Sequence, residues 1–132
     1  MLHIGLLPVI KIKESPESQP VVLQNIFFHS GMAELLPESD TEIELLKDML
    51  NSYPELNIKI TGHTDNVGNE DDNLVLSQRR ASAVSAALIV KGISASRIIP
   101  DGKGESVPIA DNNTEEGRQK NRRTEFVLMK IP

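Results

Sequence analysis

The chain has 132 residues, of which 39% are hydrophobic, 25% charged and 3% aromatic, and its net charge is −5. These values are typical of one globular domain that can bury a core, and the acidic balance argues against a nucleic-acid binder or a protein that adheres to anionic membranes. The absence of cysteine excludes disulfides, thiolate metal sites and cysteine nucleophiles.

The chain begins with IGLLPVIKIK at 4–13, whose alternation predicts a short strand, and continues with the proline-bounded linker ESPESQP at 14–20. We interpret residues 1–19 as a tail or the remnant of an upstream domain, and 20–132 as one domain. The first apolar run lacks the basic leader of a signal peptide and is too short to span a bilayer. We therefore expect no direct membrane insertion of this domain, which we interpret as part of a longer protein.

Strand and helix patterns then alternate along the chain. VVLQNIFF at 21–28 is rich in β-branched and aromatic residues and predicts a strand. A helix is predicted between Pro37 and Pro54, since its apolar residues recur at helical spacing, and LNIKITG at 56–62 predicts a second strand.

Asn73 is a suitable N-cap for a second helix, which Gly92 would close. The remaining elements that we predict are a strand at 97–103, a helical turn at 114–120 and a final strand at 124–131. The order β-α-β-α-β-β predicts an α/β (α+β) sandwich, with helices packed on one face of a small mixed sheet.

The segment TGHTDNVGNEDDNLVLSQRR at 61–80 contains the main candidate site. Helical periodicity places Asn73, Ser77 and Arg80 on the side of the helix that faces the sheet, whereas Arg79 points to water. Arg80 at the margin of a core requires an anion, and Asp65 is predicted at the end of the preceding strand. The two would either flank a pocket for a zwitterionic ligand or pair with each other as a structural ion pair.

Other interpretations of this segment fit less well. The pattern of a calcium loop fails because Val67 and Gly68 stand where a ligand and a spacer should be. A metal pair of His63 and Asp65 lacks further ligands, since the only other histidines are His3 and His29. Residues 70–72 are interpreted as a solvated acidic loop face. We expect no metal site, no cofactor and no catalysis.

A basic cluster, GRQKNRRTEF at 117–126, precedes the last strand. Strand alternation places Arg122 and Thr124 on the face of Phe126, whereas Arg123 shares the opposite face with Glu125. One of the two arginines could provide a second contact to an anion, and alternation alone does not decide which.

Several separated motifs resemble the OmpA-like C-terminal domain, a family that includes the peptidoglycan-associated lipoprotein and the peptidoglycan-binding part of the flagellar stator. They occur in order over residues 21–130: T-G-H-T-D-N-x-G, N-x-x-L-S-x-x-R-A, K-G-I-x-x-x-R-I and G-x-G-E-x-x-P-I-A-x-N-x-T-x-E-G-R-x-x-N-R-R-x-E-F.

The resemblance implies non-covalent binding of peptidoglycan through the meso-diaminopimelate of its stem peptide. It implies that Asp65 meets the amine and Arg80 a carboxylate. It assigns supporting contacts to Asn73, to Arg122 as an added anion contact, and to backbone groups of Thr64.

One departure from the family's pattern follows the first strand, where an acidic turn is usual and this chain has Phe28-His29-Ser30-Gly31. A histidine there could alter the pocket rim, formed by His29, Gly31 and Met32, or make binding depend on pH.

The resemblance implies a periplasmic domain of an outer-membrane or envelope protein of Gram-negative bacteria, with peptidoglycan and other envelope proteins as partners and no nucleic acid. Two alternatives remain. The domain could have lost its ligand and serve protein assembly alone. It could also be a metal-dependent wall hydrolase, but the sequence lacks the metal ligands that such an enzyme requires.

Overall fold

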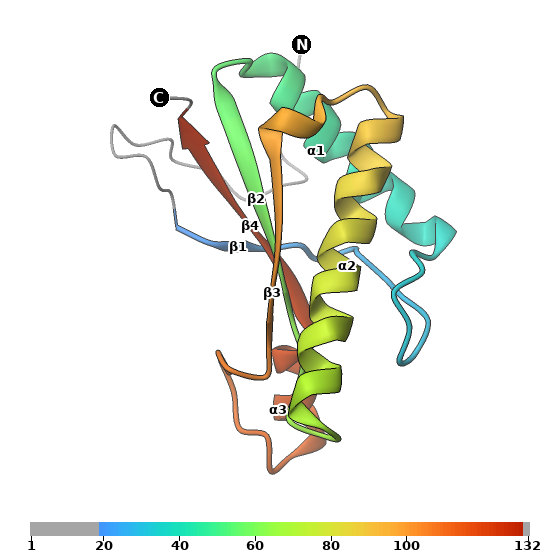
Figure 1. Cartoon of the computed structure of the whole chain (residues 1–132), viewed down its shortest axis with the longest axis vertical. Helices are drawn as coiled ribbons and strands as arrows, with labels where there is room; N and C mark the ends of the chain where they lie inside the picture. The colour runs from blue at the N-terminus through green and yellow to red at the C-terminus, as the bar shows by residue number, and fades with distance from the viewer. Residues whose placement is uncertain (1–18, 131–132) are drawn as a thin grey trace.

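The computed structural model describes residues 19–130, so the strand predicted at 4–13 lies outside the described residues (Figure 1). The elements in chain order are β1 (Val21–Val22), a 3-10 turn (Pro37–Ser39), α1 (Asp40–Ser52), β2 (Leu56–His63), α2 (Glu70–Val90), a second 3-10 turn (Ala95–Arg97), β3 (Ile98–Gly104), α3 (Glu115–Asn121) and β4 (Arg123–Lys130).

The four strands form one mixed sheet in the order β1-β4-β2-β3. β4 is antiparallel to both β1 and β2, whereas β3 is parallel to β2, and α2 makes the crossover between the two parallel strands. Helices α1 and α2 cover one face of the sheet, and the short α3 lies near the end where β4 begins (Figure 1). The predicted fold class is confirmed.

The core lies between α1, α2 and this face of the sheet. Ile58 and Ile60 of β2 are fully buried, and Phe126 of β4 is 1% exposed, because alternate residues of both strands point to the helices. Val84 and Leu88 on α2 are also fully buried. Burial of each such side chain contributes roughly 1.5–3 kcal/mol. Between residues 19 and 130, no helix is long and apolar enough to cross a membrane.

Two glycines allow α2 to lie close to the sheet. A Cβ on Gly62 of β2 would clash with the backbone carbonyl of Ser77, and a Cβ on Gly102 of β3 would clash with the backbone of Gln78. Ser77 is fully buried, and its hydroxyl accepts a hydrogen bond of 2.8 Å from the backbone N–H of Gly104. This close contact fixes the N-terminal half of α2 against the strands, and with it Asn73 and Arg80.

The strand predicted at 21–28 is too long. Only Val21–Val22 pair with β4 as a strand, followed by a hydrogen bond from the Leu23 N–H to the Thr124 carbonyl (2.9 Å). At Phe27 the backbone N–H and carbonyl both bond the hydroxyl of Ser39, at 2.8 and 3.1 Å. Ser39 lies directly before α1, so these bonds draw residues 24–28 away from β4 and toward the helices.

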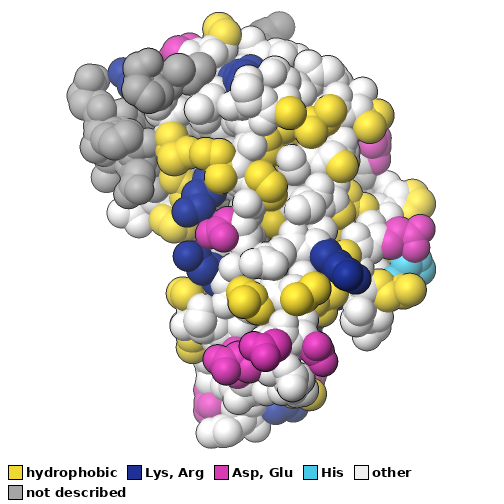
Figure 2. All heavy atoms as spheres, viewed as in Figure 1, with side chains coloured by type: hydrophobic (Ala, Val, Ile, Leu, Met, Phe, Trp, Pro, Cys, Tyr) yellow, Lys and Arg dark blue, Asp and Glu magenta, His cyan; other side chains and the backbone are white. Residues whose placement is uncertain are grey.

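The predicted start of the second helix is also wrong. Asn69, rather than Asn73, is the N-cap, because its side-chain oxygen accepts hydrogen bonds from the N–H groups of Asp71 and Asp72. Residues 70–72 therefore form the first turn of α2, where acidic side chains stabilise the positive end of the helix dipole. They remain exposed, and Figure 2 shows acidic side chains gathered over the lower end of α2.

Candidate functional site

Asp65 lies in the loop after β2, which ends two residues earlier, at His63. The residue is 8% exposed, and both of its carboxylate oxygens accept hydrogen bonds. Oδ1 accepts the backbone N–H of Val67 at 3.0 Å, and Oδ2 accepts Nη1 of Arg122 at 2.6 Å. Asp65 is thus a nearly buried carboxylate that is held by its own loop on one side and by an arginine on the other.

Arg122 lies at the junction of α3 and β4 and bonds two carboxylates. Its Nη2 donates to Oε2 of Glu115 at 2.6 Å, in addition to the bond with Asp65. Hydrogen bonds to Glu115 and Asp65 raise the pKa of Arg122, and the bond from Arg122 lowers the pKa of Glu115. The structural ion pair considered between Asp65 and Arg80 is therefore wrong, because Arg122 takes that position.

Arg80 of α2 has no carboxylate partner among the described residues. Its Nε donates to the carbonyl of Met32 at 2.8 Å and its Nη2 to the carbonyl of His29 at 3.3 Å, and the guanidinium lies 4.8 Å from the centroid of the Phe28 ring. Burial lowers the pKa of Arg80, the charge of Arg122 lowers it further, and the charge of Asp65 opposes both. Arg80 is a half-buried cation whose direct contacts are two neutral carbonyls and an aromatic ring.

Asn73 and Thr64 hold the loop that contains Asp65. Nδ2 of Asn73 donates to the carbonyls of Asp65 (3.3 Å) and Val67 (3.0 Å) and to the Glu105 carboxylate (3.0 Å). The backbone N–H of Thr64 bonds the carbonyl of Gly104 at 2.8 Å, and its hydroxyl bonds the carbonyl of Asp65 at 2.7 Å. Both residues lie beside Asp65 as predicted, and their hydrogen bonds fix the loop.

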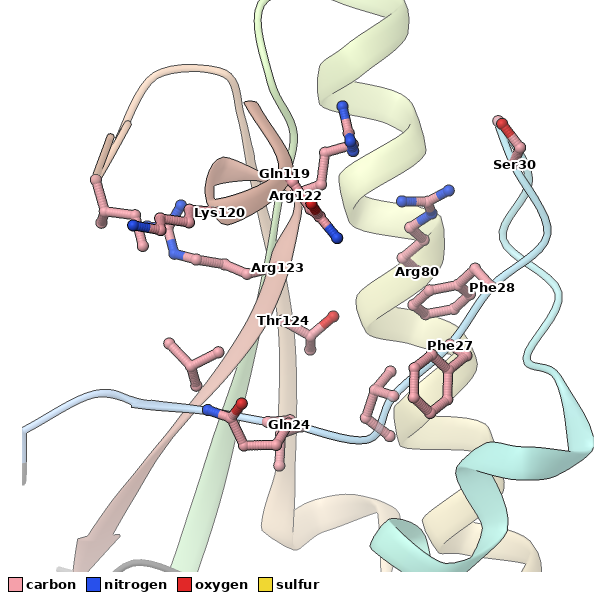
Figure 3. Close-up of a pocket in the computed structure, with 15 residues that line it drawn as sticks. Gln24, Phe27, Phe28, Ser30, Arg80, Gln119, Lys120, Arg122, Arg123 and Thr124 are labelled. Carbon is pink, nitrogen blue, oxygen red and sulfur yellow. The ribbon is translucent and has the colours of Figure 1, made fainter. Parts of the chain in front are cut away.

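A groove of about 750 Å³ extends from Arg80 along the segment after β1 and the start of β4 (Figure 3). Arg80 lies above the ring of Phe28, and Gln119 and Arg122 lie across from it on the α3–β4 side. Among residues 19–130, no aspartate or glutamate lines the groove, and the charged side chains that line it are cations: Arg80, Lys120, Arg122 and Arg123. In a chain of net charge −5, such a lining is suited to an anionic group.

The residues predicted at the pocket rim contribute in two ways, one by lining the groove and two by bonding Arg80. Gly31, at a φ of 68°, lines the groove in the turn after Phe28. His29 and Met32 are exposed and contribute the carbonyls that bond Arg80. The contribution of the His29 side chain to binding stays a prediction.

The structure distinguishes the two adjacent arginines. Arg122 bonds Asp65, whereas Nε of Arg123 bonds Oε2 of Glu125 at 2.7 Å on the face of the sheet away from α1 and α2. His63 is 4% exposed, and its Nε2 lies 3.2 Å from Oε1 of the same glutamate. Its Nδ1 has no hydrogen-bond partner in the part of the chain that the structure describes. Burial lowers the pKa of His63, and the charge of Arg123 adds to that effect, while Glu125 opposes it.

Sequence reasoning missed two groups at the site. Glu115 was not proposed, because its link to Arg122 depends on how α3 is set against β4. The stacking of Arg80 on Phe28 was not proposed either, although an aromatic residue near a predicted anion-binding arginine is a usable signal. Within the described range, no group of three or more histidine, aspartate or glutamate side chains is placed to hold a metal ion.

The arrangement can bind a ligand that carries both charges. Arg80 and Arg122 line the groove from opposite sides, and the Asp65 carboxylate is bonded to Arg122 (Figure 3). An ammonium and a carboxylate on one ligand would therefore each meet an opposite charge. No hydroxyl–histidine pair of the kind that activates a nucleophile is among the hydrogen bonds of residues 61–80.

Comparison with known proteins agrees with this fold. A model of the OmpA family matches residues 27–122. Lipoprotein YiaD of Escherichia coli is 41% identical over 104 residues, which cover 79% of this chain and 48% of that protein. Peptidoglycan-binding protein ArfA of Mycobacterium tuberculosis is 39% identical over 103 residues, which cover 78% of this chain and 32% of that protein. The chain thus spans about half or less of these curated relatives.

Solved structures show the same architecture. A MotB-like protein from Desulfovibrio vulgaris superposes with a TM-score of 0.77 at 30% identity, covering 97% of this chain and 84% of the other. The peptidoglycan-associated lipoprotein from Burkholderia pseudomallei superposes with a TM-score of 0.73 at 27% identity, covering 80% of this chain and 90% of the other. The sequence match and these structural matches together establish that the chain is a member of the OmpA family.

Proposed function

We propose that this domain binds cell-wall peptidoglycan without catalysis, through the meso-diaminopimelate of the stem peptide, and anchors an envelope assembly to the wall. One observation carries the proposal. The guanidinium of Arg80, which lacks a carboxylate partner among the described residues, lines a groove in which those residues place no acidic side chain. The nearly buried carboxylate of Asp65 is bonded to Arg122, which lines the same groove.

The chemistry of the ligand matches these charges. One end of diaminopimelate carries an ammonium and a carboxylate on the same carbon atom. Asp65 would accept the ammonium, and the planar fork of Arg80 would bind the carboxylate through two parallel hydrogen bonds. Because Phe28 and the carbonyls of His29 and Met32 already fix the Arg80 guanidinium, little side-chain entropy is lost when the carboxylate binds.

The relatives support the same role. ArfA is named as a peptidoglycan-binding protein, and the similar proteins include a lipoprotein and outer-membrane porins. In the proposal, the domain lies in the periplasm, and any remaining part of the protein contacts other envelope proteins.

Sedimentation with purified cell walls tests the proposal. The protein should sediment with diaminopimelate-type walls and much less with lysine-type walls, which lack the second carboxylate and would leave a cation at the groove without its anion. Arg80→Gln should abolish sedimentation. The matched control Arg79→Gln removes the same charge from the exposed neighbouring side chain and should sediment like the wild type.

A folded wild type that stays in the supernatant with both wall types would reject the proposal. The domain would then serve protein assembly alone. Equal sedimentation with both wall types would reject diaminopimelate as the recognised group.

A further inference from the structure

Arg122 is hydrogen-bonded to the carboxylate of Asp65, which in the proposed function binds the ammonium of the ligand. We propose that Arg122 determines specificity: it covers Asp65 in the free protein and leaves only for a ligand that offers a carboxylate together with its ammonium. This inference rests on the proposed function and adds a selection step to it.

The hydrogen bonds of Asp65 show why Arg122 has to move. Oδ1 is held by the N–H of Val67 within the same loop, and Arg122 is bonded to Oδ2, so an ammonium that takes the place at Oδ2 has to displace Arg122. The side chain of Asp65 is 11% exposed, whereas that of Arg122 is 37% exposed. The arginine is therefore the partner that has room to turn away.

Glu115 provides a partner for Arg122 after this movement. The two carboxylates bond different nitrogens of the guanidinium, Nη1 for Asp65 and Nη2 for Glu115. One bond can therefore break while the other is kept. The side chain of Glu115 is 65% exposed, so it can follow the guanidinium.

The number of ion pairs then decides which ligands bind. A diaminopimelate end exchanges the Asp65–Arg122 pair for two new pairs, one between Asp65 and its ammonium and one between the freed Arg122 and its carboxylate, which Arg80 also binds. A lysine side chain brings only an ammonium, so it replaces one pair at Asp65 with another and gains none. Arg122 thus discriminates against a lone ammonium by competing with it.

Calorimetric titration with two stem peptides, identical except for diaminopimelate or lysine at the third position, tests the inference. Wild type should prefer the diaminopimelate peptide. In Arg122→Gln the lysine peptide should bind more tightly than it does to wild type, by roughly fivefold if the displaced ion pair contributes about 1 kcal/mol. The diaminopimelate peptide should bind more weakly, so that the preference shrinks, while Arg79→Gln should keep the wild-type preference.

A second variant tests the same idea in the opposite direction. Glu115→Gln leaves Arg122 with no carboxylate once a lysine peptide takes Asp65, so the preference for diaminopimelate should widen. This variant changes an exposed side chain and should fold normally, which circular dichroism would verify.

The outcomes separate the two proposals. Unchanged or weaker binding of the lysine peptide to a folded Arg122→Gln, with wild type still binding the diaminopimelate peptide, would overturn the role of Arg122 and leave the proposed function intact. If Arg122→Gln does not fold, an unchanged preference in Glu115→Gln would overturn it instead. Failure of wild type to bind either peptide would reject the proposed function as well.

Discussion

Gly62→Ala tests whether the contact between α2 and β2 holds the site in place. A Cβ on Gly62 would clash with the carbonyl oxygen of Ser77 and lie 3.1 and 3.3 Å from its carbonyl carbon and Cα. All three are backbone atoms of α2, so no side chain can turn aside to make room. The helix itself has to move away from the strand.

The expected loss of stability follows from two opposing effects. Inserting a methyl group into a packed region costs about 1–3 kcal/mol, and the upper end applies here because a helix backbone has to shift. Alanine restricts the unfolded chain more than glycine does, which returns about 0.4–1 kcal/mol. We expect the free energy of unfolding to fall by about 2 kcal/mol. Ligand binding should weaken too, because Asn73 and Arg80 lie on the same stretch of helix.

Urea unfolding followed by far-ultraviolet circular dichroism measures the change, since the chain has no tryptophan to report by fluorescence. Ser82→Ala is the control, because it introduces alanine at an exposed position of α2, where it adds no atom to a packed contact. A Gly62→Ala variant within about 0.5 kcal/mol of wild type would refute the reasoning, since that is the range of an ordinary surface substitution.

Three further predictions follow from side chains near the site and in the core. Because burial lowers the pKa of His63 below its usual 6.5, the free energy of unfolding should fall as the pH drops from about 6.5 through the folded-state pKa. Urea unfolding at several pH values should show this dependence reduced in His63→Gln. Arg97→Ala removes hydrogen bonds to the carbonyls of Leu50, Tyr53 and Leu56 and should cost about 2 kcal/mol by the same assay, with ligand affinity unchanged. Asn73→Ala releases the loop of Asp65 and should weaken ligand binding roughly tenfold by calorimetry, with only a small shift in melting temperature.

The elements that follow local periodicity were predictable from the sequence. Alternation in the last strand separated Arg123 and Glu125 from the face of Phe126, because period-two side-chain direction is a property of the strand alone. The direction of Arg80 toward the sheet face of its helix, and of Arg79 toward water, followed in the same way. Most predicted element boundaries lie within a few residues of those observed.

Errors arose where a distant partner decides the local structure. Residues 24–28 have strand propensity, but the hydroxyl of Ser39 takes the backbone groups of Phe27 and draws this segment off the sheet. The helix start was misplaced because two asparagines fit an N-cap, and the observed hydrogen bonds select Asn69. The partner of Asp65 was misassigned because Arg122 is 57 residues away, and its approach depends on the packing of α3 against β4.

The most direct test of the central claim is calorimetric titration of a diaminopimelate-containing stem peptide into wild type, Asp65→Ala and Arg80→Ala, each shown to be folded by circular dichroism. Arg79→Ala is the control for the loss of one positive charge. We predict binding to wild type and the control, and none to Asp65→Ala or Arg80→Ala. Absence of binding to folded wild type, or undiminished binding to either site variant, would contradict recognition of a zwitterion by Asp65 and Arg80.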